Sequence, residues 1–284
     1  MIENSEIEIA YRSAINFTKS HYENFPVLSV FVPKYLQKHV AIVYQFARQA
    51  DDIADEGNVT ALERIEKLNE YEKALDDSLR GIYRNQFWIG LANTVHNQEL
   101  TSLNFKKLLI AFRQDTTKKE YETLDELLNY CANSANPVGR IILELYQIKD
   151  DRANYYSDKI CTALQLTNFL QDVSTDYEKG RIYLPQEYIN KHNVDVSIFK
   201  TKKMGTSFQT LIRDEVQKVR ELFCEGEKLL PHLPFRLKQQ IKWTIRGGIG
   251  ILTKIENIHY DVLNHRPTFS KIDLVKLLFN LNVC

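Results

Sequence analysis

Residues 168–185 read NFLQDVSTDYEKGRIYLP, and this stretch places oxygen-bearing side chains on one face of an otherwise apolar helix. Asn168, Asp172 and Asp176 are four residues apart, so at about 100° per residue they fall within an arc of about 80°. A solvated helix face explains such spacing as readily as a binding site does. Taken alone, the stretch leaves both alternatives open.

The same stretch ends in a short basic turn and a proline. Gly180 can adopt the left-handed backbone conformation that closes a helix, and Pro185 keeps the segment that follows the helix extended. We therefore expect the helix to end at this turn, with Lys179, Arg181 and Tyr183 grouped at its C-terminal end.

A second acidic stretch, YQFARQADDIADE at 44–56, favours the binding-site alternative. Asp51 and Asp55 lie at i and i+4, with two further acidic residues beside them and Arg48 one turn earlier. Like charges at this spacing destabilise a helix by a few tenths of a kcal/mol, and burial of unpaired carboxylates costs far more. A cation bound between the two acidic helices explains why both motifs persist.

The residue types of the two motifs indicate which cation they bind. Carboxylate and amide oxygens, without His or Cys at ligand spacing, favour a hard cation. Magnesium takes only one or two carboxylates per ion and completes its shell with water and substrate phosphates. Two like unit charges about 4 Å apart repel by about 4 kcal/mol at an effective dielectric constant near 20, so a diphosphate needs the metal to bind beside carboxylates. The sequence therefore predicts Mg²⁺ and a diphosphate ligand.

Basic side chains next to both motifs are candidates for the phosphate oxygens that the metal does not bind. A lone basic residue is more often a surface charge, and position beside the acidic motifs favours Arg48 and Arg181 over that alternative. The candidates beside the motifs are Arg48, Lys179, Arg181 and Tyr183, and Arg266, after the long C-terminal helix, is a further candidate.

Apolar residues recur at spacings of three and four along almost the whole chain, which predicts an all-α fold. No linker-like segment or repeat of solenoid length interrupts the pattern, so we expect residues 1–284 to form one domain, a compact helical bundle with a central cavity. The expected helices are 5–20, 34–56, 60–79, 82–96, 102–115, 123–133, 137–148, 151–177, 206–229, 235–264 and 270–281.

The composition excludes several classes of protein. Lys plus Arg and Asp plus Glu number 37 each, so no net charge favours nucleic acid or an anionic membrane. The N-terminus lacks the features of a signal peptide, and no apolar run reaches the length of a transmembrane helix. We expect a cytoplasmic protein, and composition is compatible with a peripheral contact at the inner membrane surface. The cysteines lack metal-ligand spacing and are expected to be reduced thiols: Cys131, Cys161, Cys224 and Cys284.

The two acidic motifs together resemble a known family. DDIAD at 51–55 with Tyr44 and Arg48 upstream, and NFLQDVSTD at 168–176 followed by KGRIYLP, are similar to the squalene and phytoene synthase group of trans-isoprenyl diphosphate synthases. The similarity runs from about residue 10 to residue 266. The resemblance implies an all-α bundle of the isoprenoid-synthase type with a central cavity.

Three shorter segments narrow the resemblance to one branch. HYENFPV at 21–27, YCANSANPVGR at 130–140 and YDVLNHRP at 260–267 are similar to the bacterial hydroxysqualene synthases of hopanoid biosynthesis. The resemblance implies two to three Mg²⁺ ions bound with the diphosphate by Asp51, Asp55, Asn168, Asp172 and Asp176. It implies catalytic roles for Asp51, Asp55, Asp172, Asp176 and Tyr44. The substrate-binding residues that it implies are His21, Tyr22, Arg48, Gln165, Lys179, Arg181, Tyr183 and Arg266.

Four residues at three sites depart from the carotenoid-forming side of the group. Gln171 stands where many of those relatives carry Arg, which removes or replaces a phosphate contact. His21 and Tyr22 occupy a segment that is usually Ser-rich there, and Gly248 stands in place of a Tyr. These differences disfavour a phytoene or dehydrosqualene synthase and fit the hydroxysqualene branch.

The implied reaction is the Mg-dependent conversion of presqualene diphosphate to hydroxysqualene, a carbon–oxygen lyase reaction. Loss of diphosphate leaves a cyclopropylcarbinyl cation, which aromatic faces could stabilise and water then captures. Core packing is the alternative role for each candidate ring, and these rings are Phe46, Tyr130, Phe169 and Tyr260. No NAD(P)H is expected, because GGIG at 247–250 lies in an expected helix and no GxGxxG follows a strand.

Two other functions stay open at this point. One is a head-to-head prenyl transferase of the squalene, presqualene diphosphate or phytoene synthase type, and the other is a non-catalytic assembly or binding protein. The expected partners are a prenyl diphosphate substrate and, as further options, a membrane surface and neighbouring enzymes of squalene synthesis. No nucleic acid partner is expected.

Overall fold

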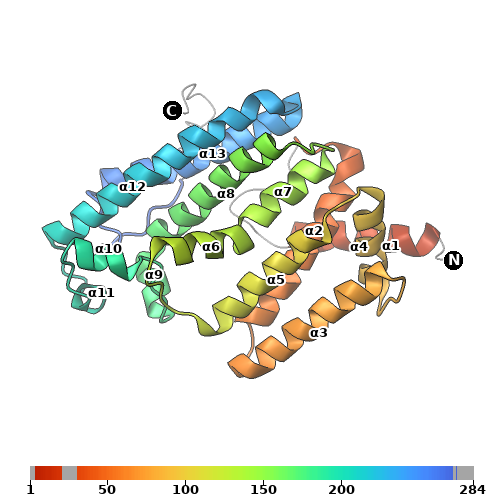
Figure 1. Ribbon diagram of the computed structural model, residues 1–284, viewed down its shortest axis with the longest axis horizontal. Helices are drawn as coiled ribbons and strands as arrows, with labels where there is room; N and C mark the ends of the chain where they lie inside the picture. Colours follow the sequence, from red (N-terminus) through yellow and green to blue (C-terminus); the bar gives the residue numbers. More distant parts are fainter. Residues whose placement is uncertain (1–3, 21–30, 271–272, 274–284) are drawn as a thin grey trace. The chain divides into compact units, whose positions relative to one another are not determined.

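The protein is described by a computed structural model over residues 4–20, 31–270 and 273 (Figure 1). Within these ranges it is built from helices, with one isolated β-bridge and no strand, which confirms the all-α prediction. The elements are α1 (Asn4–Ser20), α2 (Lys34–Asp55), α3 (Ala61–Leu79), α4 (Gln86–Asn97), α5 (Ser102–Thr117), α6 (Leu124–Ser134), α7 (Asn136–Leu145), α8 (Asp151–Gln171), α9 (Val173–Glu178), α10 (Gln186–Lys191), α11 (Ser197–Thr201), α12 (Thr206–Gly226), the 3₁₀ helix η1 (Glu227–His232) and α13 (Phe235–Asn257).

Several helix boundaries differ from the sequence-based expectation. The helix expected at 151–177 is divided at Asp172 into α8 and α9. The helix expected at 235–264 ends at Asn257, because His259 and Tyr260 adopt positive φ angles of 51° and 63°. The short helices α10 and α11 were not expected, since five or six residues are too few for a recognisable period. The helix expected at 270–281 lies almost entirely outside the described residues.

Contacts between backbone segments group the chain into two compact units, and the single-domain prediction stays a prediction. Unit 1 comprises residues 1–117, 137–154 and 234–237, and unit 2 comprises residues 118–136, 155–233 and 238–284, each considered over its described residues. The chain therefore passes between the units several times. None of the described helices combines the length and the apolar composition needed to cross a lipid bilayer.

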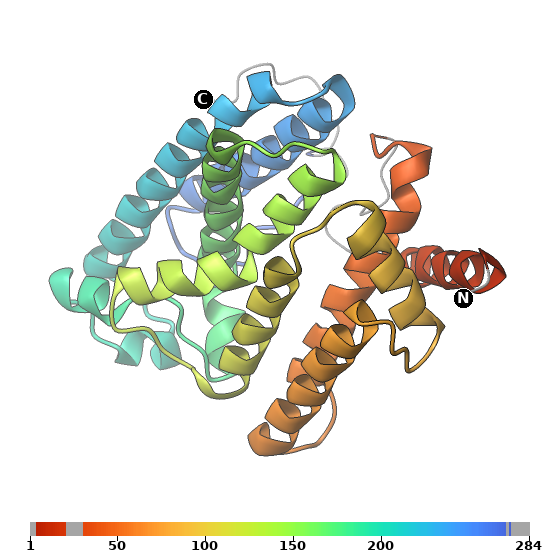
Figure 2. The same ribbon diagram turned by 45° about the vertical axis from the view of Figure 1, so that its right-hand side comes forward.

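Unit 1 is organised around α2. Helix α1 packs against α2 and α4, and α5 packs against α2 and α3; α3 and α5 run side by side in Figure 2. Phe46 of α2 is fully buried and contacts the rings of Tyr71, Trp88 and Phe105 at centroid distances of 5.1, 6.4 and 5.2 Å. The core-packing alternative therefore holds for Phe46.

Unit 2 contains close helix contacts that require glycine. A Cβ atom on Gly226 of α12 would lie 2.5 Å from a side-chain carbon of Ile160 in α8. A Cβ atom on Gly248 of α13 would lie 2.2 Å from the Phe223 ring of α12. These approaches let α12 lie close to both α8 and α13 (Figure 1).

The cysteines only partly follow the sequence-based expectation. Cys131 and Cys161 are not part of a disulfide bond, and burial raises the pKa of the Cys131 thiol to about 12. Cys224 is disulfide-bonded, so the expectation of a reduced thiol is wrong at this position. Cys284 lies outside the described residues.

Candidate active site

The second acidic motif lies at the junction of α8 and α9 in unit 2. The backbone N–H of Asp172 donates to the carbonyl of Asn168 at 2.9 Å, and that of Asp176 donates to the carbonyl of Asp172 at 2.8 Å. The helical hydrogen-bond pattern therefore continues through the junction, although Asp172 itself has φ −106° and ψ 14°. Asn168 is exposed, whereas both aspartates are half-buried. The predicted succession of the three oxygen-bearing residues is present.

The turn after the motif forms as the sequence predicts. Gly180 has a φ of 73°, and the N–H of Arg181 donates to the carbonyl of Asp176 at 2.8 Å. The N–H of Gly180 donates to the carbonyl of Tyr177 at 2.8 Å. These hydrogen bonds and the left-handed glycine close the helix and turn the chain back past Asp176.

A second segment holds the chain in position after this turn. Ile182 donates to the carbonyl of Lys119 at 2.8 Å and forms a parallel bridge with Glu120, and Gln186 donates to the carbonyl of Tyr121 at 2.9 Å. Residues 181–186 are therefore fixed by main-chain hydrogen bonds on both sides of Tyr183.

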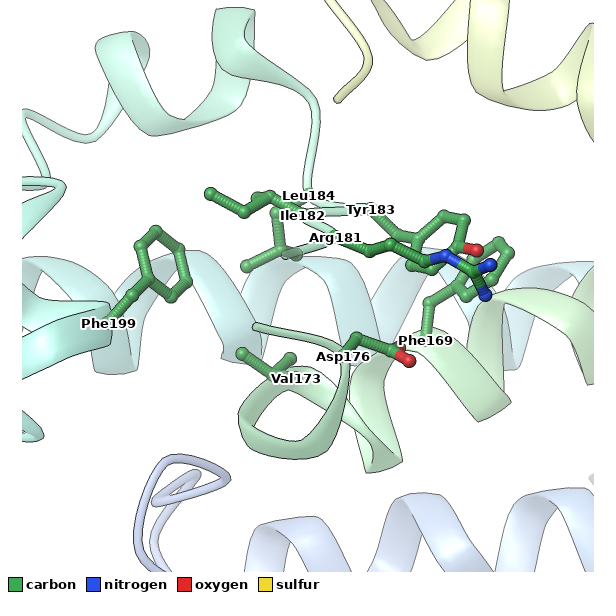
Figure 3. A pocket seen from close by; sticks show the side chains of 8 residues that line it. All are labelled: Phe169, Val173, Asp176, Arg181, Ile182, Tyr183, Leu184 and Phe199. Atoms are coloured by element: carbon green, nitrogen blue, oxygen red, sulfur yellow. The ribbon is translucent and has the colours of Figure 1, made fainter. Parts of the chain in front are cut away.

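Aromatic and aliphatic side chains, together with Asp176 and Arg181, line a small cavity beside the motif. The rings of Phe169 and Tyr183 are stacked at a centroid distance of 3.8 Å and an interplanar angle of 8°, and Tyr130 lies 6.0 Å from Phe169. Arg181 extends alongside these two stacked rings, and Asp176 lies below its guanidinium group in Figure 3. The cavity has a volume of about 10 Å³, room for about one water molecule.

The charges around Asp176 oppose one another. Burial and the neighbouring charge of Asp172 raise the pKa of the Asp176 carboxyl group from its usual 3.8 to about 6. Lys179, Arg181 and Arg266 act in the opposite direction and lower it. Three of the predicted phosphate-binding cations are thus close enough to the second motif to affect its ionisation.

Arg266 forms an ion pair with the second motif. Its Nε donates to Asp172 Oδ1 at 2.5 Å and its Nη2 donates to Oδ2 at 3.2 Å. Gln171, the residue before Asp172, donates from its side-chain amide to the carbonyl of Pro267. Sequence reasoning marked Gln171 only as a departure from relatives, because its partner is 96 residues away and no local pattern reveals it.

The first acidic motif occupies the last turns of α2 in unit 1. Arg48 forms ion pairs with Asp52 at 2.8 Å, with Asp51 at 3.6 Å and with Glu56 at 3.4 Å. Asp55, the last residue of α2, is exposed. Arg48 is therefore next to the predicted metal ligand Asp51, as the spacing implies.

Sequence reasoning missed Arg64, which fixes the end of this helix. Its guanidinium group donates to the carbonyls of Ile53, Glu56 and Gly57 at 3.1, 2.9 and 2.8 Å. These carbonyls have no partner within a regular helix. Arg64 of α3 therefore supplies the hydrogen-bond donors for the carbonyl groups at the turn that follows Asp55. Only the known position of α3 could have revealed this role.

The other predicted site residues differ in their burial, and two of them lie outside the described residues. Tyr44 is half-buried on α2, with its ring 6.4 Å from that of Phe17. Gln165 is half-buried on α8, one turn before Asn168. His21 and Tyr22 lie outside the described residues. Among the aromatic candidates outside unit 1, Tyr130 and Phe169 are buried and Tyr260 is half-buried.

The donors in each motif suit magnesium. Within the part of the chain that the structure describes, no three His, Cys, Asp or Glu side chains form a group that could hold a metal by itself. Carboxylate pairs with an amide oxygen nearby match an ion that takes one or two carboxylates and completes its shell with water and phosphate. The charge of Asp172 contributes to the raised pKa of Asp176, so a bound cation would stabilise the ionised form of these carboxylates. Mg²⁺ remains a proposal that these residues fit.

Comparisons with known proteins give consistent results. The family model for squalene/phytoene synthase matches residues 18–273. The chain is 36% identical over 167 residues to a hydroxysqualene synthase of Zymomonas mobilis, covering 58% of this chain and 55% of that protein. It is 25% identical to a phytoene synthase of Arthrospira platensis, covering 93% of this chain and 90% of the relative. The crystal structure of squalene synthase HpnC from Alicyclobacillus acidocaldarius matches with a TM-score of 0.86 and 34% identity, over 91% of this chain and 97% of the other.

The all-α fold and the two acidic helices with their basic neighbours define a class of protein suited to diphosphate chemistry. The chain belongs to the squalene/phytoene synthase family. It is therefore an enzyme of a family that acts on prenyl diphosphates, and the sequence-based resemblance to this family is confirmed.

Proposed function

We propose that the protein is a hydroxysqualene synthase that converts presqualene diphosphate to hydroxysqualene with Mg²⁺. The observation that carries the proposal is the second acidic motif, where Asp172 and Asp176 lie beside three cations, Lys179, Arg181 and Arg266. The hydroxysqualene synthase among the relatives and the segments that resemble this branch support the choice of reaction.

Asp51, Asp55, Asn168, Asp172 and Asp176 are the proposed Mg²⁺ ligands. When bound, the ions neutralise the diphosphate leaving group and lower the barrier to breaking its bond to carbon. Arg181 and Lys179 bind diphosphate oxygens that the metal leaves uncovered, and the extended segment after Gly180 holds Arg181 in place.

The remaining steps concern the carbon skeleton. The carbon–oxygen bond breaks and the diphosphate leaves with the electron pair, which gives a carbocation. The stacked rings of Phe169 and Tyr183 offer π faces to such a cation. Water then adds to the rearranged cation and releases one proton, so the product is a tertiary alcohol and no reductant is consumed.

Product analysis tests this proposal directly. The purified protein is incubated with presqualene diphosphate and Mg²⁺ in the absence of NADPH, and the lipid extract is analysed by mass spectrometry. We expect hydroxysqualene. Formation of squalene alone, and only after addition of NADPH, would rule out capture by water.

A head-to-head prenyl transferase is the second candidate function. It is favoured by the phytoene synthase relative, which aligns over 93% of this chain. Farnesyl diphosphate as sole substrate distinguishes the two candidates: the transferase forms presqualene diphosphate or a C30 hydrocarbon from it, whereas a hydroxysqualene synthase leaves it unchanged. Contact with a membrane surface remains a prediction from the low water solubility of a C30 product.

A further inference from the structure

Two adjacent residue pairs join the second acidic motif to the segment that follows α13. Gln171 donates from its side-chain amide to the carbonyl of Pro267, and Arg266 forms a two-point ion pair with Asp172. The pairs 171–267 and 172–266 run in opposite chain directions, so they form a double link between the same two short segments.

The two contacts differ in how firmly they are held. The Asp172 and Arg266 side chains are 26% and 45% exposed, and a solvent-exposed ion pair by itself fixes a long arginine side chain only weakly. Gln171 is 8% exposed and Pro267 is buried, so the amide-to-carbonyl hydrogen bond is shielded from competing water. The buried hydrogen bond between Gln171 and Pro267 is therefore the contact that fixes the backbone next to Arg266.

Two further side-chain-to-carbonyl hydrogen bonds hold the same segment, and neither involves a residue of the second acidic motif. Gln209 donates to the carbonyl of His259 at 3.3 Å, and Asn264 donates to the carbonyl of Lys202 at 3.0 Å. Neither residue is adjacent to an acidic ligand. Only the contact of Gln171 is next in sequence to both members of the ion pair.

We propose that Gln171 is a positioning residue, which holds the Pro267 carbonyl so that the Arg266 guanidinium stays at Asp172 and binds a diphosphate oxygen there. The identity of the anion rests on the proposed function. The hydrogen bond itself and its effect on Arg266 do not depend on that function, so the two can be tested apart.

The main variant is Gln171→Met, which keeps the length of the side chain and removes the donor. Gln171→Glu, measured at pH 8, is a second variant of equal size with a carboxylate that cannot donate when ionised. The matched control is Gln209→Met, which removes the same kind of amide-to-carbonyl hydrogen bond from the same segment. Thermal unfolding of each variant confirms that it is folded.

The first measurement is the affinity for inorganic pyrophosphate in the presence of Mg²⁺, by isothermal titration calorimetry. We expect Gln171→Met to weaken the affinity about tenfold, in line with the loss of one charge-assisted hydrogen bond. Arg266→Gln should weaken it by a similar factor, and the double variant should show no additional loss, because Gln171 acts through Arg266. Gln209→Met should retain the wild-type affinity.

The second measurement observes Arg266 without any ligand. A hydrogen-bonded arginine Nε–H exchanges slowly and gives a resolved ¹⁵N–¹H NMR signal, which Arg266→Gln identifies by its loss. We expect Gln171→Met to abolish this signal and Gln209→Met to retain it. Persistence of the signal in both Gln171 variants overturns the proposal, as does its loss with unchanged affinity for pyrophosphate.

Failure of the proposed function gives a different result. If the wild-type protein does not bind pyrophosphate with Mg²⁺, the diphosphate assignment falls together with the proposed function. The NMR comparison still decides whether Gln171 positions Arg266.

Discussion

At the scale of single residues, the second motif is a set of opposed charges. Asp176 is partly deprived of solvent and lies near Asp172, which raises its pKa to about 6, while Lys179, Arg181 and Arg266 lower it. Such a group of charges favours a ligand that brings both a divalent cation and a multiply charged anion. Magnesium diphosphate has this combination.

Replacement of Asp172 by Asn tests whether its charge serves catalysis or stability. We expect Asp172→Asn to lower turnover at least about a hundredfold, because a proposed metal ligand is lost. Its ion pair with Arg266 is partly exposed, so the free energy of unfolding should change by at most about 1 kcal/mol. Glu178→Gln on α9, which removes an exposed carboxylate paired with Lys202, is the control and should retain activity. A large loss of stability in Asp172→Asn would instead assign Asp172 a structural role.

His39 gives unit 1 a predictable dependence on pH. It is 5% exposed and its Nδ1 lies 2.9 Å from the Thr94 hydroxyl, which also bonds to the Tyr11 hydroxyl at 2.9 Å. Burial, together with the charge of Lys38, lowers the pKa of His39 from 6.5 to about 4. Between these values the unfolded chain binds a proton that the folded protein does not, so the free energy of unfolding falls as the pH falls.

We expect His39 to account for a loss of about 3 kcal/mol between pH 6.5 and pH 4. Urea unfolding at a series of pH values measures this loss, and His39→Gln should have a flatter profile across the window. His96→Gln, at an exposed position on α4, should follow the wild-type profile. Equal slopes for wild type and His39→Gln would contradict the assignment.

At the scale of elements, the sequence predicted those features that depend on contacts between residues close together in the chain. The closure of the acidic helix at Gly180 and the extended segment before Pro185 follow from residue types within a few positions of each other. Arg64 at the end of α2 and Gln171 at Pro267 were missed, because each acts on backbone that another element brings close. Predicted helix boundaries were wrong where the helix ends without a glycine or proline, as at His259 and Tyr260, whose positive φ angles the sequence does not indicate.

The close contact between α12 and α13 requires glycine at position 248. A Cβ atom there would lie 2.2 Å from Phe223 Cζ, and Phe223 is fully buried. We expect Gly248→Ala to destabilise the protein by about 3 kcal/mol, measured by denaturant unfolding. The pair Gly248→Ala with Phe223→Leu should be less destabilised than the two single effects added together. Additive effects would show that the ring is not the obstacle.

At the scale of the whole molecule, the sequence predicted the class of fold and the family but not the grouping of contacts. Helical periodicity and the two acidic motifs were sufficient for the all-α fold and the squalene/phytoene synthase family. The division into two units depends on long-range contacts, since each unit combines segments from distant parts of the chain. The first motif belongs to unit 1 and the second to unit 2. No local pattern assigns a motif to a unit.

Ligand-induced stabilisation tests the proposed role of both motifs in binding Mg²⁺ and diphosphate. A ligand present at about a hundred times its Kd stabilises the folded state by about 2.7 kcal/mol, which for a chain of this size raises the Tm by roughly 5–10 °C. We expect this shift in differential scanning calorimetry when Mg²⁺ and a non-hydrolysable diphosphate analogue are present together, and a much smaller shift with either one alone. Asp51→Asn and Asp172→Asn should each abolish it, because the proposal requires carboxylates of both motifs. Loss of the shift in only one variant would restrict diphosphate binding to a single motif, and its absence in the wild type would contradict diphosphate binding at both motifs.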